Sequence, residues 1–483
     1  MKTLAVLCAA ALFLTAGCTL GPDFVRPEPP KAERYTYGPQ PSATARAAGR
    51  SQEFRQGARV AARWWGLFKS PKVDAVVREA IVNSPGLLAA QAGLRQSQEL
   101  LRAGEGVFYP QADAGFDATR QKFSQARFGG KAASSIFNLY TLSATVSYAL
   151  DVFGGERRRV EGLGAQVDYQ RYIMLGTYLS LSGNIINTMI AQAAYREEIR
   201  ATGHLIDLEK EQISITEAQA EAGTVPYSNV LSLQSQLAAI EAALPPLKQK
   251  LSQANHLLAV LTGREPAQWR PPEIALADLT LPAELPVSLP SDLARQRPDI
   301  LASEAQVHAA SANIGVATAA MFPSFALNGS YGLESTSIGN LFKSTSSIWS
   351  LGAGVTAPLF HGGTLSAERR AAIEACNQSL QNYRQTVLGA LAQVADTLRG
   401  LEHDAQALNA QSKAVSAAEE ALRLIQANYQ AGTVNYLQVL TADGLYYQAK
   451  ISYIQAQAQW LQDTVALFAA LGGGWWNEGE KAR

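Results

Sequence analysis

The sequence predicts a mainly α-helical fold with a small β part and an internal two-fold repeat. Similar blocks recur in both halves, two long proline-free stretches keep a seven-residue apolar period, and four short stretches alternate between apolar and polar residues. The 483 residues hold 41 basic and 41 acidic side chains, so the formal net charge is zero. No nucleic acid is therefore expected as a partner.

The N-terminus is typical of an export signal. Lys2 precedes an apolar run at residues 4–14, which is too short for a membrane-spanning helix. Residues 14–18 then resemble the bacterial lipobox, in which the cysteine becomes the acylated mature N-terminus. We expect residues 1–17 to be a signal peptide and Cys18 to be lipidated. An ordinary signal peptide with an incidental cysteine is the alternative.

Cysteine usage excludes a disulfide framework. The chain has three cysteines, of which Cys8 leaves with the signal and Cys18 carries lipid. Cys376 then has no partner. It lies in a helical stretch, where a small packing residue is the ordinary interpretation.

Two proline-rich segments frame the repeats. Residues 21–41 hold six prolines and predict an extended tether within an N-terminal region at 18–70. A second proline-rich segment at 263–290 predicts a linker near the middle of the chain. These segments leave 71–262 and 291–472 as the two repeats. The last residues, 473–483, form a short C-terminal tail.

The repeats match at three blocks without large gaps. Their matched positions are Pro110 with Pro323, Phe153 with Phe360, and Gly223 with Gly432. The spacing between matched positions varies by only a few residues. This regularity indicates a duplication, so each half should contain the same elements in the same order.

A helix and two strands begin each repeat. We expect a helix over 71–105, and the strands are expected at about 110–120, 139–152, 323–333 and 348–360. Between Tyr140 and Leu150, for example, every second residue is apolar. Amphipathic strands of this length suit a transmembrane barrel, but four strands cannot close one, so several chains must contribute. A soluble four-stranded sheet packed on helices is the alternative.

Long helical hairpins follow the strands. No proline lies between Pro110 and Pro226, and none follows Pro358. The seven-residue period is carried by Val387, Val394, Leu401, Leu408, Val415, Leu422 and Tyr429, and in the first repeat by Tyr178, Ile185, Gln192, Ile199, Ile206, Ile213 and Ala220. Such a period indicates coiled-coil packing. We expect Pro245 and Pro246 to kink the first return helix.

These features together resemble the TolC-like outer-membrane efflux factors, in particular the lipoprotein branch found in resistance-nodulation-division type systems. Residues 18–24, followed by Arg26-Pro27, look like the mature start of that branch. The resemblance implies a homotrimer that shares a 12-stranded outer-membrane β-barrel. It also implies a long periplasmic α-helical barrel with coiled-coil hairpins, and an equatorial belt formed by the start of the chain, the linker and the tail.

The resemblance implies a passive channel rather than an enzyme. Its partners would be a periplasmic adaptor protein and an inner-membrane pump of the resistance-nodulation-division type, and its cargo would be drugs, solvents or metal ions. The chain would be lipid-anchored in the outer membrane and extend into the periplasm. A conduit for type I protein secretion is the alternative, although the lipobox favours efflux. A lipid-anchored coiled-coil scaffold would leave the alternating strands unexplained.

Catalytic, cofactor and metal sites are not expected. The five histidines are scattered without metal-ligand spacing, and a single thiol cannot build a zinc site. Paired acids fall on the long helices, where solvated carboxylates are the ordinary interpretation. The sequence therefore offers no constellation for acid–base or nucleophilic chemistry.

The resemblance places functional residues at the hairpin tips. The predicted adaptor contacts are Gly223, Thr224, Val225, Gly432, Thr433 and Val434. A capping role alone is the alternative, and it would explain the glycines but not the repeated Thr-Val. The predicted periplasmic aperture is formed by Leu437, Gln438, Thr441 and Asp443. The family carries aspartates at the positions of Gln438 and Thr441, so this chain departs from the pattern there. A ring of Asp443 is one hypothesis, and an ordinary helix-surface aspartate is the alternative.

Overall fold

The computed structural model describes residues 19–38, 42–47, 49–123 and 135–477. The predicted signal peptide, Cys18 and the end of the predicted tail lie outside the described residues. Contacts divide the chain into two units. The sheet unit comprises residues 1–27, 93–170 and 302–383, and the hairpin unit comprises 28–92, 171–301 and 384–483. Each unit draws on both repeats, and the mainly helical fold with a small β part is confirmed.

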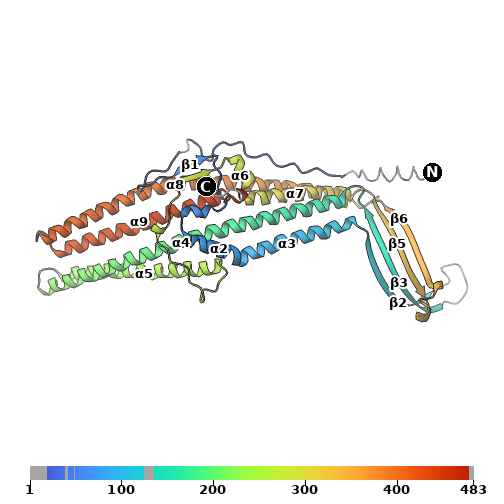
Figure 1. The fold of residues 1–483 in the computed structure, drawn as a ribbon, viewed down its shortest axis with the longest axis horizontal. Helices are drawn as coiled ribbons and strands as arrows, with labels where there is room; N and C mark the ends of the chain where they lie inside the picture. Colours follow the sequence, from blue (N-terminus) through green and yellow to red (C-terminus); the bar gives the residue numbers. More distant parts are fainter. Residues whose placement is uncertain (1–18, 39–41, 48, 124–134, 478–483) are drawn as a thin grey trace. The chain divides into compact units, whose positions relative to one another are not determined.

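The sheet unit holds one antiparallel four-stranded sheet (Figure 1). Its strands are β2 (Gln111–Phe123), β3 (Ser135–Leu150), β5 (Ser324–Ser335) and β6 (Ser347–Thr356), in the order β2-β3-β5-β6. Both predicted hairpins are present, with ends shifted by a few residues. The two hairpins join where β3 pairs with β5. The sheet therefore combines strands from both repeats.

The register places the apolar residues of all four strands on one face. Ala114 pairs with Ala144, Ala144 with Tyr331, and Tyr331 with Trp349. Two residues along, Val146 continues the same face because side chains alternate with a period of two. The predicted alternation is thus in phase across the sheet, and the opposite face carries mainly small and polar side chains.

Prolines divide the helix predicted at 71–105 into two. The structure has α2 (Pro71–Asn83) and α3 (Pro85–Glu105), separated by Ser84. The prediction of one helix was wrong here because the residue before a proline disfavours the helical conformation. The second repeat breaks in the same way between α6 (Pro290–Gln296) and α7 (Pro298–Ala319).

The long helices have matching lengths in the two repeats. Helices α4 (Gly155–Glu221) and α8 (Thr364–Gln430) have 67 residues each, and the return helices α5 (Tyr227–Leu261) and α9 (Tyr436–Ala470) have 35 each. Helix α5 continues through its two internal prolines, which do not end it. None of the described helices is long and apolar enough to cross a membrane.

The predicted linker contributes structure to the hairpin unit. Its strand β4 (Glu284–Val287) pairs in parallel with β1 (Glu53–Gln56) from the N-terminal region. Nearby, the Trp64 ring stacks on Phe468 with their centroids 5.3 Å apart. Both aromatic side chains are fully buried. The linker and the N-terminal region are therefore packed parts of this unit.

The seven-residue period is buried over only part of α8. Val394, Leu401 and Leu408 are buried, whereas Leu422 is half-buried and Tyr429 is exposed within one chain. The apolar period thus continues beyond the part that a single chain covers. Its far end is available to another surface.

We predict that Leu401→Ala lowers the free energy of unfolding by about 2–5 kcal/mol, because it opens a cavity in the fully buried part of the seam. Thermal melting followed by circular dichroism at 222 nm would measure the change. The exposed Lys413→Ala on the same helix is the control, with an expected change within about 0.5 kcal/mol. Equal melting temperatures for Leu401→Ala and wild type would contradict the burial.

Candidate functional site

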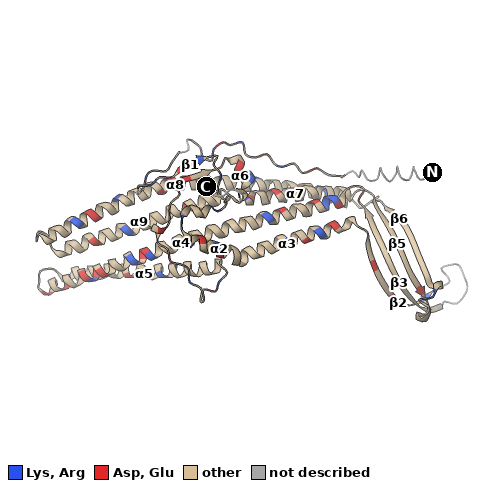
Figure 2. Cartoon of the chain, viewed as in Figure 1, with Lys and Arg blue, Asp and Glu red and all other residues tan. Residues whose placement is uncertain are grey.

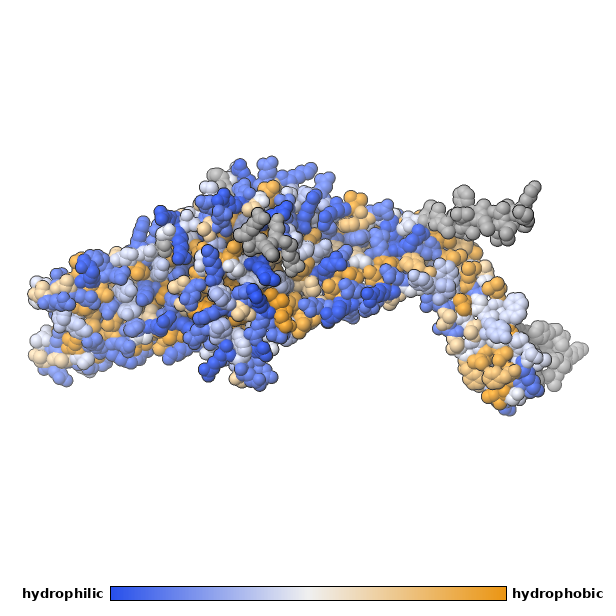
Figure 3. Space-filling model, in the orientation of Figure 1, coloured by the Kyte–Doolittle hydropathy of each residue, from blue (hydrophilic) through white to orange (hydrophobic). Residues whose placement is uncertain are grey.

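The apolar face of the sheet is uncovered within one chain. Trp349 is 77% exposed and Leu351 is 82% exposed, and Tyr331 and Val355 are also largely exposed. Figure 3 shows apolar residues gathered over the strands on the face in view. Contiguous exposed apolar surface of this kind marks contact with a membrane or another protein.

The strands also carry few charges. Figure 2 shows that most of the charged residues in the described part of the chain lie on the helices. On the polar face, Asp113 pairs with Thr145, which continues to Ser330 and Ser350 across the sheet. The hydroxyls of Ser330 and Ser350 are 2.7 Å apart and hydrogen-bonded. This face is suited to water, and the opposite face is suited to lipid.

Both hairpin tips end their long helix with the same cap. In the first tip, the Gly223 N–H donates to the Ala220 carbonyl and the Thr224 N–H donates to the Gln219 carbonyl. Gly223 has a φ of 70°, the left-handed conformation that this Schellman cap requires. The second tip repeats the arrangement at Gly432, with a φ of 72°. The predicted capping glycines therefore have this local role.

The threonines also belong to the caps, which the sequence did not reveal. The Thr224 hydroxyl donates to the Gln219 carbonyl at 2.8 Å, and the Thr433 hydroxyl donates to the Asn428 carbonyl at 2.9 Å. Thr-Val repetition had pointed to adaptor contact because a glycine cap alone did not explain it. The hydroxyl bonds now explain the threonines, while Val225 and Val434 stay half-buried.

The predicted aperture stretch starts α9. The Asn435 side chain accepts from the Gln438 N–H at 3.1 Å and caps the helix. Gln438 and Thr441 are exposed, and Leu437 is half-buried. The structure therefore presents these three predicted residues near one helix end.

Asp443 has different surroundings from the rest of the stretch. It is half-buried, and burial raises the pKa of its carboxyl, while the nearby His204 on α4 opposes this shift. The His204 ring stacks on Tyr447 of α9 with their centroids 5.0 Å apart. Asp443 thus belongs to the contact between α9 and α4.

Polar contacts join α9 to the C-terminal part of α4. The Tyr436 hydroxyl donates to Glu211 at 3.0 Å, and the Gln455 amide donates to Glu198 at 2.9 Å. A cavity of about 410 Å³ lies between them, lined by Glu197, Arg200, Ala201, His204, Ala275, Tyr447, Lys450 and Ile454. These contacts link the two hairpins, and no sequence pattern had indicated them.

A second unforeseen cluster lies between α8 and α9. Asp404 is half-buried and lies beside Asp463, whose carboxylate also accepts from Gln459 at 3.1 Å. Burial, followed by the interaction with the neighbouring Asp463 carboxylate, raises the pKa of Asp404 to about 8. The pair therefore holds a proton at neutral pH.

A metal site has no support among the residues that the structure describes. These residues contain no group of three or more histidine, cysteine, aspartate or glutamate side chains placed to hold an ion. Cys376 is half-buried on α8, and burial raises the pKa of its thiol. A raised pKa lowers the reactivity of a thiol, as expected for a packing residue.

Comparisons with known proteins show which proteins this chain is similar to. A family model described as Outer membrane efflux protein matches residues 76–264 and 289–473. The pyoverdine export outer membrane protein OpmQ of Pseudomonas putida is 30% identical over 417 residues, covering 86% of this chain and 88% of OpmQ.

Two further proteins match nearly the whole chain. The probable outer membrane lipoprotein SilC of Salmonella typhimurium is 27% identical, covering 98% of this chain and 100% of SilC. The solved structure of the outer-membrane channel OprN superimposes with a TM-score of 0.82 at 25% identity. That match covers 95% of this chain and 100% of the OprN chain.

We predict that Asp404→Asn reduces the pH dependence of stability. The folded pKa of Asp404, about 8, lies above the ordinary value of 3.8, so the folded chain keeps a proton that the unfolded chain releases. The stability that comes from this retained proton is fully present below the ordinary pKa and is lost as the pH rises through the folded pKa. The melting temperature of the variant should therefore fall less than that of wild type between about pH 5 and pH 9.

Asp463→Asn is the matched variant. It removes the neighbouring carboxylate but leaves Asp404 buried, so the pH dependence should weaken without disappearing. Parallel melting curves for wild type and Asp404→Asn across this range would show that the pair does not hold the proton.

Proposed function

The chain belongs to the outer membrane efflux protein family, and on this premise we propose that it is the outer-membrane channel subunit of a tripartite efflux pump. It conducts small molecules passively to the cell exterior. The observation that carries this proposal is the sheet, with one apolar and one polar face in register across all four strands. We propose no catalytic role.

The open edges of the sheet support a homotrimer. Among the described strands, β2 and β6 each pair on one side only. An unpaired edge is costly in lipid, and the smallest membrane barrels have about eight strands. Three chains joined edge to edge would supply twelve strands. Their apolar faces would then meet lipid and their polar faces would line a water-filled lumen.

Two partners and a lipid complete the proposed assembly. The exposed tips at Gly223 and Gly432 are the proposed contacts for a periplasmic adaptor, and an inner-membrane pump of the resistance-nodulation-division type would supply the energy. Cys18 is the proposed lipidation site, supported by the lipobox resemblance and by a relative that is named as a lipoprotein. The relatives' efflux names favour this role over protein secretion.

We predict opposite outcomes for arginine at two adjacent positions of β6. Leu351→Arg places a charge on the proposed lipid face and should cost about 2–4 kcal/mol near the bilayer centre, lowering the amount of trimer in the outer membrane. Ser350→Arg faces the proposed lumen, so it should insert normally and shift the ion selectivity of single channels in planar bilayers.

The wild-type trimer should conduct in the same bilayers. Outer-membrane fractionation and single-channel recording together separate failure to insert from failure to conduct. A conducting Leu351→Arg trimer at wild-type abundance would contradict the assignment of the faces. A folded wild-type protein that is monomeric and does not conduct would contradict the proposed function.

We propose that the aperture is lined by Leu437, Gln438 and Thr441. We propose that Asp443 does not line the aperture but packs against α4. Gln438→Lys should lower cation conductance because the side chain is exposed at the helix end. Asp443→Lys should instead lower the melting temperature, since it replaces a half-buried carboxyl that His204 favours with a positive charge beside His204. Single-channel recording and thermal melting of both variants test this division. If only Asp443→Lys lost cation conductance, the result would contradict this division and support an aperture formed by a ring of Asp443.

A further inference from the structure

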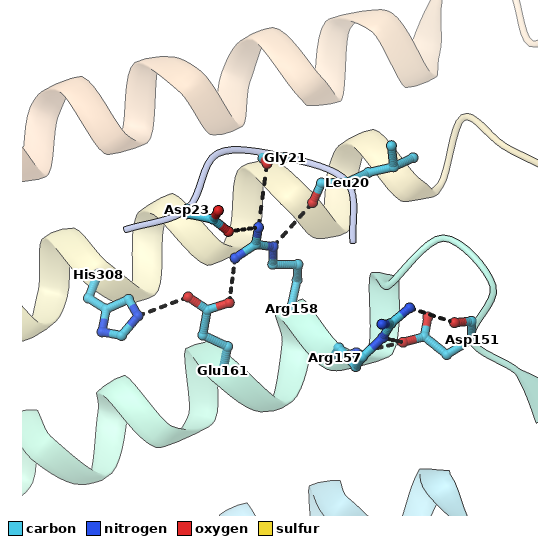
Figure 4. Close-up of polar contacts among 8 residues, drawn as sticks. All are labelled: Leu20, Gly21, Asp23, Asp151, Arg157, Arg158, Glu161 and His308. Atoms are coloured by element: carbon cyan, nitrogen blue, oxygen red, sulfur yellow. Dashed lines mark hydrogen bonds and ion pairs between the residues drawn. The ribbon is translucent and has the colours of Figure 1, made fainter. Parts of the chain in front are cut away.

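The segment that follows Cys18 is bound to the sheet unit. The Leu20 N–H donates to the carbonyl of Phe153, in the turn between β3 and α4, at 3.1 Å. From there the segment runs beside α4 and α7, as Figure 4 shows for Leu20, Gly21 and Asp23. The prolines predicted an extended tether, but residues 20–26 make specific contacts.

Arg158 of α4 holds this segment. Its Nε donates to the Leu20 carbonyl at 3.1 Å, and its Nη2 donates to Asp23 at 2.6 Å and to the Gly21 carbonyl at 3.4 Å. Its Nη1 donates to Glu161 at 2.7 Å. The Arg158 side chain is only 5% exposed. Without the segment, this buried guanidinium would keep only Glu161 among these acceptors, and an unsatisfied buried charge is costly.

The contacts continue along α7. Phe24 stacks on the His308 ring with their centroids 4.2 Å apart and their planes inclined by 17°. His308 Nε2 lies 2.9 Å from Glu161, the same carboxylate that binds Arg158 (Figure 4). Arg26 donates to Glu304 of α7 at 2.7 Å. The segment therefore contacts a helix from each repeat.

Glycines allow the backbones to approach closely. A Cβ atom on Gly315 of α7 would lie 2.8 Å from the Leu20 carbonyl oxygen, and one on Gly154 would lie 2.7 Å from the Thr19 Cα. Gly21 lies against the Gly315 backbone with a φ of 92°, which a side chain would disfavour. The close approach of residues 19–21 therefore requires glycine, which has no side chain, at positions 154 and 315.

We propose that α4 and α7 form a docking site for the chain's own N-terminal segment, with Arg158 as its positioning residue and Gly154 and Gly315 as its seat. Docking also has a consequence for the lipid, which rests on the proposed lipidation of Cys18. Because Cys18 is covalently next to Thr19, docking fixes the acyl chains beside the turn between β3 and α4. The segment links the two repeats by binding to a helix of each, and the lipid is attached at one fixed position on the protein.

A spin label in the segment tests the docking. Val25 is largely exposed between Phe24 and Arg26, so Val25→Cys in a Cys376→Ser background accepts a nitroxide without occupying the seat. In Arg158→Gln, the label should rotate about threefold faster or more in continuous-wave spectra of the full trimer. The control is Arg159→Gln, at the position next to Arg158. It removes an exposed ion pair with Glu156 and should leave the spectrum unchanged.

A glycine pair provides a second test. Gly315→Ala places a methyl group 2.6 Å from the Arg158 Cγ and 2.8 Å from the Leu20 carbonyl oxygen, so it should displace both groups and mobilise the same label. Gly164→Ala is the matched control, because a Cβ on this helical glycine meets nothing within 4 Å. Circular dichroism of each variant shows whether its helices still form. If Arg158→Gln and Gly315→Ala fold and both leave the label as ordered as in wild type, the docking site is refuted.

Palmitate labelling of the same variants separates this proposal from the proposed function. Label uptake into wild type and Arg158→Gln alike is expected, since Arg158 is assigned to docking rather than to acylation. Absence of label from wild type would refute lipidation and the fixed position of the lipid. The spin-label spectra would still decide the docking site itself.

Discussion

A one-residue slip between β3 and β5 would turn the apolar residues of one hairpin to the opposite face of the sheet. The observed register, in which Ala144 pairs with Tyr331, prevents this and keeps Trp349 on the same face as Ala144. The same pairing joins the two repeats in one sheet. Because α4 follows β3 and α8 follows β6, the positions at which both long helices begin also depend on it.

The two repeats share their local physics but differ in their surroundings. Both tips use a left-handed glycine and a threonine hydroxyl to satisfy carbonyls at a helix end. The return helices nevertheless start differently, since Asn435 caps α9 with its side chain while Pro226 precedes α5 without such a bond. A duplicated sequence therefore gives similar hairpins with distinct ends, which allows the two tips different contacts.

Buried charge is handled in two ways in this chain. Arg158 keeps its charge because backbone carbonyls and carboxylates surround it, and several of these acceptors come from far away in the sequence. Asp404 instead retains a proton beside Asp463, because burial and a neighbouring carboxylate both disfavour its ionised form. The first arrangement binds a segment to the sheet unit, and the second makes the contact between α8 and α9 sensitive to pH.

Short-range patterns determined the elements. Alternation fixed the strands, the lack of proline fixed the long helices, and Gly223 and Gly432 fixed the hairpin tips. The sequence by itself did not place Arg158 beside Leu20, or Asp443 beside His204, because such contacts join residues that no local period relates. Only the tertiary structure decided these, since the partners of a buried polar group are selected by how the elements pack.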